Sequence, residues 1–192
     1  MTVLLPPHRS LILGGVKSGK SRHAECLADA CSRQDAAQVI LIATATAKDA
    51  EMQQRIDRHK KERNKSWAVL EEPLALANAL NQATGDNAGP AEQNCIVIDC
   101  LTLWVTNLLL QSDDELLRQE IDDFKQAVKS CRSRLIIVSN ETNLGITPMG
   151  ELSRRFCDET GLLHQALGQI CEDVALMVAG IPMNIKKTGP ST

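Results

Sequence analysis

Aromatic residues and excess positive charge are both scarce in this 192-residue sequence. It contains 2 Trp, 2 Phe and no Tyr, and its formal net charge is −3, with a pI of about 5.8. Proteins that bind nucleic acid usually carry a basic patch, and those that bind single strands stack the bases on aromatic side chains. We therefore expect no nucleic-acid partner.

The sequence also lacks a long hydrophobic run and any C-x-x-C pair. The first apolar run ends at Pro6, and no basic region precedes it. The seven cysteines are spread singly through the chain, without the spacing of a zinc site. We therefore expect no signal peptide, no membrane span, free thiols and a cytoplasmic protein.

Length and composition favour one globular domain over residues 1–192. The sequence is 43% hydrophobic and 23% charged, values that are ordinary for such domains. We expect residues 1–9 to form a flexible leader and residues 187–192 a flexible tail.

Short apolar runs alternate with helical patterns along the chain. Strands are predicted at residues 10–13, 38–44, 67–70, 95–99, 134–139 and 174–179. Helices are predicted at residues 20–33, 49–63, 73–83, 101–110, 114–131 and 150–171, with Pro73 at a first helical position and a loop at residues 81–94. Continuous Val, Ile and Leu in the strands predicts an α/β fold, in which helices cover both faces of a mostly parallel sheet.

A glycine-rich motif follows the first predicted strand. It matches G-x-x-x-x-G-K-[ST] without a gap and consists of Gly14, Gly15, Val16, Lys17, Ser18, Gly19, Lys20 and Ser21. In this motif the backbone N–H groups surround phosphates, the lysine contacts the β and γ oxygens, and the final hydroxyl binds Mg²⁺. The alternative is an ordinary glycine-rich turn. The strand before the motif and the helix after it favour a nucleotide site.

Asp99 closes the apolar strand predicted at residues 95–99. P-loop enzymes usually place a second carboxylate near Mg²⁺, and Asp99 is the candidate at the end of a neighbouring strand. We predict that Asp99 and Ser21 bind the metal ion. An aspartate just before a helix is also a common N-cap, so the sequence leaves that role open.

His59 lies in the charged helix predicted at residues 49–63. The basic residues around it are Arg55, Arg58, Lys60, Lys61 and Arg63. Such a positive field would attract a triphosphate and favour a neutral imidazole, which is a competent nucleophile. Taken alone, the pattern is more typical of a solvated basic helix face.

A wider set of motifs changes that interpretation. They stand at residues 14–25 (GGVKSGKSRHAE), 42–46 (IATAT), 49–52 (DAEM), 55–59 (RIDRH), 99–107 (DCLTLWVTN), 138–141 (VSNE), 145–148 (GITP) and 179–182 (AGIP). In this order they resemble the bifunctional adenosylcobinamide kinase/adenosylcobinamide-phosphate guanylyltransferase family of cobalamin synthesis. The resemblance runs from about Leu11 to Lys186.

The resemblance implies a RecA-like P-loop fold, a homotrimer and a two-step reaction. ATP or GTP with Mg²⁺ would phosphorylate adenosylcobinamide, and GMP from GTP would then pass through His59 to the new phosphate. Lys20 and His59 would be the catalytic residues. Nucleotide contacts outside the P-loop would fall on Thr44, Ala45, Thr46, Lys60, Lys61, Glu62, Arg63, Glu71 and Asp99.

Two positions depart from the family pattern. Asn143 stands where the family usually has glycine, and His164 stands where it usually has asparagine. Two other functions stay open: a simple P-loop kinase of small molecules, and a RecA-like assembly protein that binds nucleotide without a small-molecule acceptor.

Overall fold

The computed structural model describes residues 8–46, 50, 53–54, 64, 66–85 and 94–187. Its strands are β1 (Arg9–Gly14), β2 (Gln38–Ala43), β3 (Ala68–Glu71), β4 (Asn94–Asp99), β5 (Arg134–Val138), β6 (Asp173–Val178) and β7 (Ile181–Lys187). Its helices are α1 (Lys20–Asp35), α3 (Leu76–Gly85), α4 (Leu101–Leu109), α5 (Asp114–Ser130) and α6 (Glu151–Ile170).

The strands form one sheet in the order β3-β2-β4-β5-β1-β6-β7. Neighbours from β3 to β6 are parallel, and β7 is antiparallel to β6. The predicted α/β fold with a mostly parallel sheet is confirmed. Because parallel strands end at the same edge, the carboxyl ends of β1 to β5 face one region, where ligands of such sheets bind.

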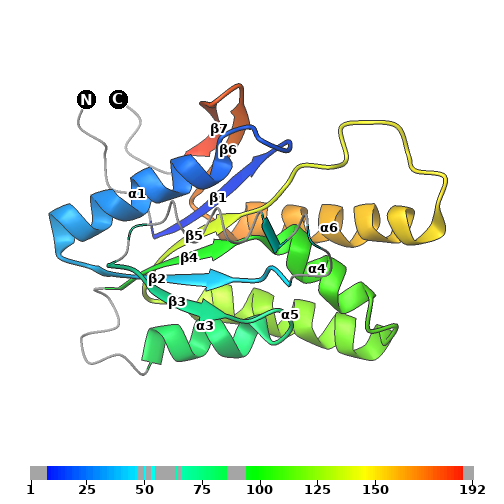
Figure 1. The fold of residues 1–192 in the computed structure, drawn as a ribbon, viewed down its shortest axis with the longest axis horizontal. Coiled ribbons are helices and arrows are strands. Elements are labelled where there is room, and N and C mark those ends of the chain that lie inside the picture. The colour runs from blue at the N-terminus through cyan, green and yellow to red at the C-terminus, as the bar shows by residue number, and fades with distance from the viewer. Residues whose placement is uncertain are drawn as a thin grey trace.

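Helices cover both faces of the sheet (Figure 1). In β1, Leu11 and Leu13 pack toward α3, α4, α5 and α6, whereas Ile12 packs with α1 on the other face. This alternation follows from the two-residue period of a strand. Burial of both faces explains why the strands read as continuous hydrophobic runs.

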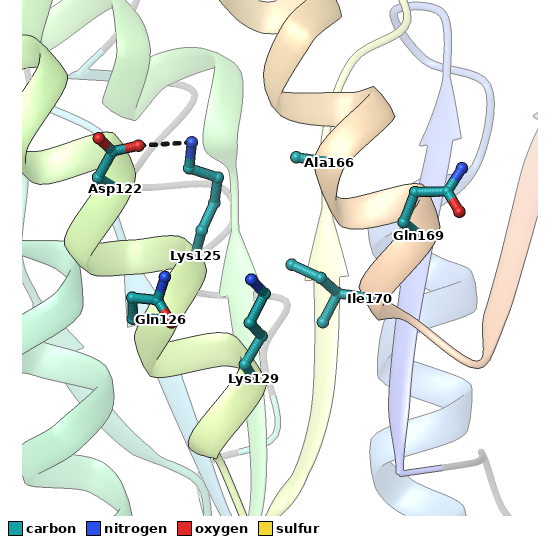
Figure 2. A pocket seen from close by; sticks show the side chains of 7 residues that line it. All are labelled: Asp122, Lys125, Gln126, Lys129, Ala166, Gln169 and Ile170. Carbon is teal, nitrogen blue, oxygen red and sulfur yellow. Dashed lines mark ion pairs between the residues drawn. The ribbon is translucent and has the colours of Figure 1, made fainter.

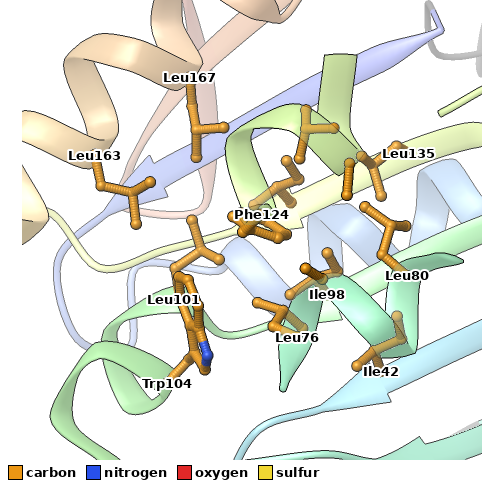
Figure 3. Packing of buried hydrophobic residues seen from close by; sticks show 14 of the residues in the cluster. Ile42, Leu76, Leu80, Ile98, Leu101, Trp104, Phe124, Leu135, Leu163 and Leu167 are labelled. Atoms are coloured by element: carbon orange, nitrogen blue, oxygen red, sulfur yellow. The ribbon is translucent and has the colours of Figure 1, made fainter. Parts of the chain in front are cut away.

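The larger core layer surrounds two aromatic rings (Figure 3). Trp104 of α4 and Phe124 of α5 are both fully buried, with ring centroids 5.1 Å apart. Trp104 also donates its indole N–H to the Leu74 carbonyl at 2.7 Å. Truncating either ring to alanine should cost about 3–5 kcal/mol in the free energy of unfolding.

Several predicted bounds were wrong. α3 begins at Leu76, so Pro73 precedes the helix; the Glu72 carboxylate accepts the N–H groups of Leu74 and Ala75, both at 2.9 Å. α3 continues to Gly85 into the predicted loop. Of the helix predicted at residues 49–63, Ala50, Gln53 and Gln54 are helical and the others lie outside the described residues.

The strand β7 was not predicted. It pairs Pro182 with Met177 at the edge of the sheet, where a proline is tolerated because no further strand needs its missing N–H. Arg9 and Lys187, expected in the flexible ends, are the first residue of β1 and the last of β7. Within the described part of the chain, we find no helix with the length and hydropathy of a membrane span.

Candidate functional site

The P-loop lies between β1 and α1 as a tight, glycine-dependent turn. Gly14 has a φ of 152°, and a Cβ at this position would meet Ser18 Oγ at 2.6 Å and the Met177 carbonyl at 2.7 Å. Gly19 caps α1 with a φ of 98°. The loop is also bonded to its surroundings, because Gly180 N–H donates to the Ser18 carbonyl at 3.0 Å. Side chains larger than hydrogen are therefore excluded at Gly14.

Lys20 is the buried cation of this loop. It is only 6% exposed, and its Nζ donates to the Gly15 carbonyl at 2.6 Å. Burial lowers the pKa of Lys20, and the nearby Cys100 and Asp99 oppose that shift. The ammonium thus lies inside the loop, where phosphate oxygens of a nucleotide would bind.

Ser21 and Asp99 meet across the site. The Ser21 hydroxyl donates to Asp99 Oδ2 at 2.9 Å, so the start of α1 touches the end of β4. The sheet order explains the approach, since only β5 separates β1 from β4. The alternative role of Asp99 as an N-cap was wrong: the N-cap of α4 is Cys100, and no side chain caps that helix end.

This pair fits a magnesium ion. Mg²⁺ prefers oxygen ligands and is usually bound by one or two protein groups together with phosphates, and both atoms of the pair are oxygens. Among the described residues, no group of three or more His, Cys, Asp or Glu side chains forms a full protein-only metal site. The residues therefore suit a metal ion that is shared with a nucleotide.

Thr44 follows β2 and bonds to the turn that follows β4. Its hydroxyl donates to the Cys100 carbonyl at 2.7 Å and accepts the Cys100 N–H at 3.0 Å. Thr46 donates to the amide oxygen of Asn107 at 3.0 Å. Of the predicted contacts Thr44, Ala45 and Thr46, Thr44 therefore bonds to the residue that follows Asp99, and Thr46 bonds to α4.

Asn107 is a buried residue of α4 that sequence reasoning left out of the site. Its amide nitrogen donates to the Thr44 carbonyl at 2.9 Å and to the Pro73 carbonyl at 3.2 Å. With the bond from Thr46, both ends of this amide are used. Asn107 ties the turn after β2 to the turn after β3. Its position at the end of the 99–107 motif was a signal that could have identified it.

The remaining predicted residues divide into three groups. Glu71 ends β3 beside Ala43 of β2, at the same edge of the sheet as Thr44. His59, Lys60, Lys61, Glu62 and Arg63 lie outside the described residues, so their roles stay predictions. Gly15, Val16 and Lys17 are exposed at the tip of the P-loop.

Ser139 and His164 form a second pair that was not predicted as part of the site. His164 Nε2 lies 2.7 Å from Ser139 Oγ, and the Ser139 side chain is fully buried at the end of β5. Nearby, Asn143 donates to the Cys157 carbonyl at 2.9 Å. Asn143 is absent from the residues with positive φ, so this position does not need the glycine that the family usually has.

A separate groove of about 500 Å³ lies between α5 and α6 (Figure 2). Its lining includes Lys125, Lys129 and Ile170 but none of the predicted site residues. The carboxyl edge of the sheet, with the P-loop, Asp99 and Thr44, is therefore the candidate site.

Fold and site together define a P-loop nucleotide-binding protein of the α/β class. The family model described as "Cobinamide kinase / cobinamide phosphate guanyltransferase" (CobU) matches residues 10–185. The chain therefore belongs to this family, and it is a bifunctional cobinamide kinase and cobinamide phosphate guanylyltransferase.

Curated relatives match over nearly their whole length. The bifunctional adenosylcobalamin biosynthesis protein CobP of Pseudomonas aeruginosa is 49% identical over 93% of this chain and 97% of its own. CobU proteins of the same description from Salmonella typhimurium and Escherichia coli are 36% and 32% identical, each over 92% of this chain and 98% of their own. The family favours the two-step enzyme over a simple kinase or an assembly protein.

Proposed function

We propose that this chain phosphorylates adenosylcobinamide with ATP or GTP and then transfers GMP from GTP to the product through His59. Both reactions use a nucleoside triphosphate, but they attack different phosphorus atoms. The P-loop serves γ-phosphoryl transfer, and His59 serves attack at the α-phosphate. The observation that carries the proposal is the Ser21–Asp99 contact at 2.9 Å, inside a P-loop of a chain from this family.

In the kinase step, the acceptor hydroxyl attacks the γ-phosphorus and the bond to the β-phosphate oxygen breaks. Lys20 offsets negative charge on the β and γ oxygens, and its burial strengthens that interaction because water screens it less. Ser21 and Asp99 would hold Mg²⁺, which supplies further charge neutralisation at the phosphates. The backbone N–H groups from Gly14 to Gly19 orient the chain of phosphates.

In the guanylyl step, an imidazole nitrogen of His59 attacks the α-phosphorus of GTP. The α–β phosphoanhydride bond breaks, pyrophosphate leaves, and the imidazole gives up its proton. A phosphate oxygen of adenosylcobinamide phosphate then attacks the guanylyl phosphorus. The P–N bond breaks, His59 is restored, and adenosylcobinamide-GDP is released. A covalent intermediate of this kind splits one displacement into two easier ones.

Several of the proposed contacts of the guanine nucleotide follow or end neighbouring strands at one edge of the sheet. Thr44, Ala45 and Thr46 follow β2, and Glu71 ends β3. Lys60, Lys61 and Arg63 follow His59 in the sequence, and their positive charge would offset that of the departing pyrophosphate, while Glu62 is proposed as a further nucleotide contact. Asn107, which bonds to Thr44 and Thr46, holds this region in shape.

A label-transfer experiment tests the two-step proposal. Purified protein is incubated with GTP labelled at the α- or the γ-phosphate, with and without adenosylcobinamide. We expect the γ label in adenosylcobinamide phosphate, and the α label first on protein and then in adenosylcobinamide-GDP. If the γ label reaches cobinamide while the α label never binds to protein, the covalent step is contradicted.

The family resemblance also supports a homotrimer and a cytoplasmic location, which we include in the proposal. Light scattering should give three times the 21.0 kDa mass of the chain. Cell fractionation should place the protein in the cytosolic fraction. A monomer mass, or recovery in another fraction, would contradict the respective part.

A further inference from the structure

The residues after β5 form a bridge across the active site. This bridge segment, Ser139–Glu141, bonds on one side to the P-loop strand: Ser139 N–H donates to the Ile12 carbonyl at 3.0 Å, and Glu141 N–H donates to the Gly14 carbonyl at 2.9 Å. On the other side, the Asn140 amide donates to Thr102 Oγ1 at 2.9 Å, in the first turn of α4. The segment thus joins the start of the P-loop to the helix that follows Asp99.

Helix α6 supports the bridge segment from outside the site. His164 Nε2 lies 2.7 Å from Ser139 Oγ, and Asn143 Nδ2 donates to the Cys157 carbonyl at 2.9 Å. Gly161 lies between these contacts, and a Cβ there would stand 2.7 Å from Asn143 Nδ2. Residues 157, 161 and 164 are spaced to share one face of a helix. That face of α6 therefore packs against the bridge segment and against Asn143, which follows it.

The imidazole of His164 is held in its neutral form at neutral pH. Burial lowers its pKa from the ordinary 6.5, and the negative charge of Glu141 opposes the shift. Helix α4, which packs against α6, has no charged residue between Leu101 and Leu109. Helix α5 brings Asp114, paired with Arg155 of α6, and Lys125 and Lys129, which line the groove beside Ile170. Glu141 is thus the charged group that acts on the pKa of His164.

We propose that His164 is a positioning residue for the kinase step, acting through the Ser139 hydroxyl to fix the bridge segment against the P-loop and the Asp99 turn. The inference rests on the proposed phosphoryl transfer at this P-loop. Its physical basis is geometric, because a displacement of about 1 Å in a catalytic group can cost about 10²-fold in rate. Because the Ser139 side chain is fully buried, we assign the effect to the position of the segment.

Protonation of His164 should weaken this support. A charged imidazole in a half-buried position is poorly solvated and is attracted to Glu141, which bonds to the P-loop through its own N–H. Kinase activity should therefore fall on the acid side, at a pH below 6.5. An asparagine at position 164 could still bond to Ser139 but cannot titrate.

The test compares His164→Leu, His164→Asn, Ser139→Ala and the His164→Leu/Ser139→Ala double variant by steady-state kinetics of cobinamide phosphorylation. His8→Asn is the control, because His8 bonds to the Arg132 carbonyl at the opposite end of β1. We expect His164→Leu and Ser139→Ala each to lower kcat by about tenfold or more, with little change in the KM for nucleotide. The double variant should be no worse than either single one.

His164→Asn should keep most of the kcat at neutral pH and lose the acid limb of the pH profile. His8→Asn should behave as the wild type in both respects. Circular dichroism checks that each variant is folded. The inference is overturned if folded His164→Leu retains the wild-type kcat, or if His164→Asn keeps the same acid limb. Absence of cobinamide phosphorylation in the wild type would instead overturn the proposed function.

Discussion

The Ser21 hydroxyl donates a hydrogen bond of 2.9 Å to the carboxylate of Asp99, which lies 78 residues away in the sequence. This contact joins the first turn of α1 to the carboxyl end of β4. It places two side-chain oxygen atoms together near the buried ammonium of Lys20. The nucleotide chemistry proposed for the chain depends on this arrangement.

Replacing Asp99 by asparagine should raise the Mg²⁺ concentration needed for activity and lower the kcat of the kinase by about 10²-fold. Asparagine keeps the size of the side chain but removes the negative charge that a metal ion needs. Asp113→Asn is the matched control, since Asp113 caps α5 by accepting the N–H groups of Glu115 and Leu116, and asparagine caps equally well. Full activity of Asp99→Asn at limiting Mg²⁺ would contradict the metal role.

Replacing Lys20 by alanine should abolish most of the kinase activity and weaken nucleotide binding. The rate should fall by about 10²–10³-fold, because water cannot stabilise the negative charge on the phosphates as the buried ammonium does. Lys129→Ala is the control, since Lys129 lines the groove between α5 and α6 (Figure 2). Turnover near the wild-type rate in Lys20→Ala would remove the P-loop assignment.

Replacing Asn107 by alanine should destabilise the protein and raise the KM for nucleotide. The buried carbonyl of Thr44 would lose its side-chain donor, which typically costs about 1–3 kcal/mol in the free energy of unfolding. Asn81→Ala, at an exposed position on α3, provides the reference for losing an asparagine side chain. The role of Asn107 is refuted if urea unfolds both variants at the same concentration.

The free energy of unfolding should decrease as the pH falls below about 6.5. Burial lowers the pKa of both His23 and His164, so the unfolded chain binds more protons than the folded chain in that range. The histidines' contribution to stability is fully present above the pKa that they have in the unfolded chain. It is lost as the pH falls toward their lower pKa values in the folded chain. Urea denaturation at pH values of about 7.5 and 5.5 measures the slope. A double variant, His23→Asn/His164→Asn, should show a smaller slope, and an unchanged slope would exclude these histidines as its source.

The sequence predicted the elements whose signals are local. The P-loop motif predicted the glycine-rich turn between β1 and α1, and the apolar run before Asp99 predicted the strand that this residue ends. The 99–107 motif marked Asn107 but could not give its contact with Thr44, and no local signal marked His164, because their partners Thr44 and Ser139 lie 63 and 25 residues away. Only the folded sheet brings those groups together.

Two local errors have similar causes. Pro73 is compatible with a first helical position, but the Glu72 side chain forms a turn before the helix begins. The last strand was predicted to end at residue 179, yet β7 follows it and, as an edge strand, tolerates Pro182. In both cases the sequence allowed two structures, and contacts with neighbouring groups selected one.

The central claim is that one P-loop site supports two different transfers, with His59 as the covalent carrier of GMP. Its most direct test is the label from α-labelled GTP that remains on denatured protein, measured for wild type and His59→Ala. Kinase activity is assayed in parallel as the control for folding.

The wild type should carry acid-labile, alkali-stable label. His59→Ala should carry none while it keeps most of its cobinamide kinase activity, because Lys20 and Ser21 remain in place. Label that persists in His59→Ala would contradict the account.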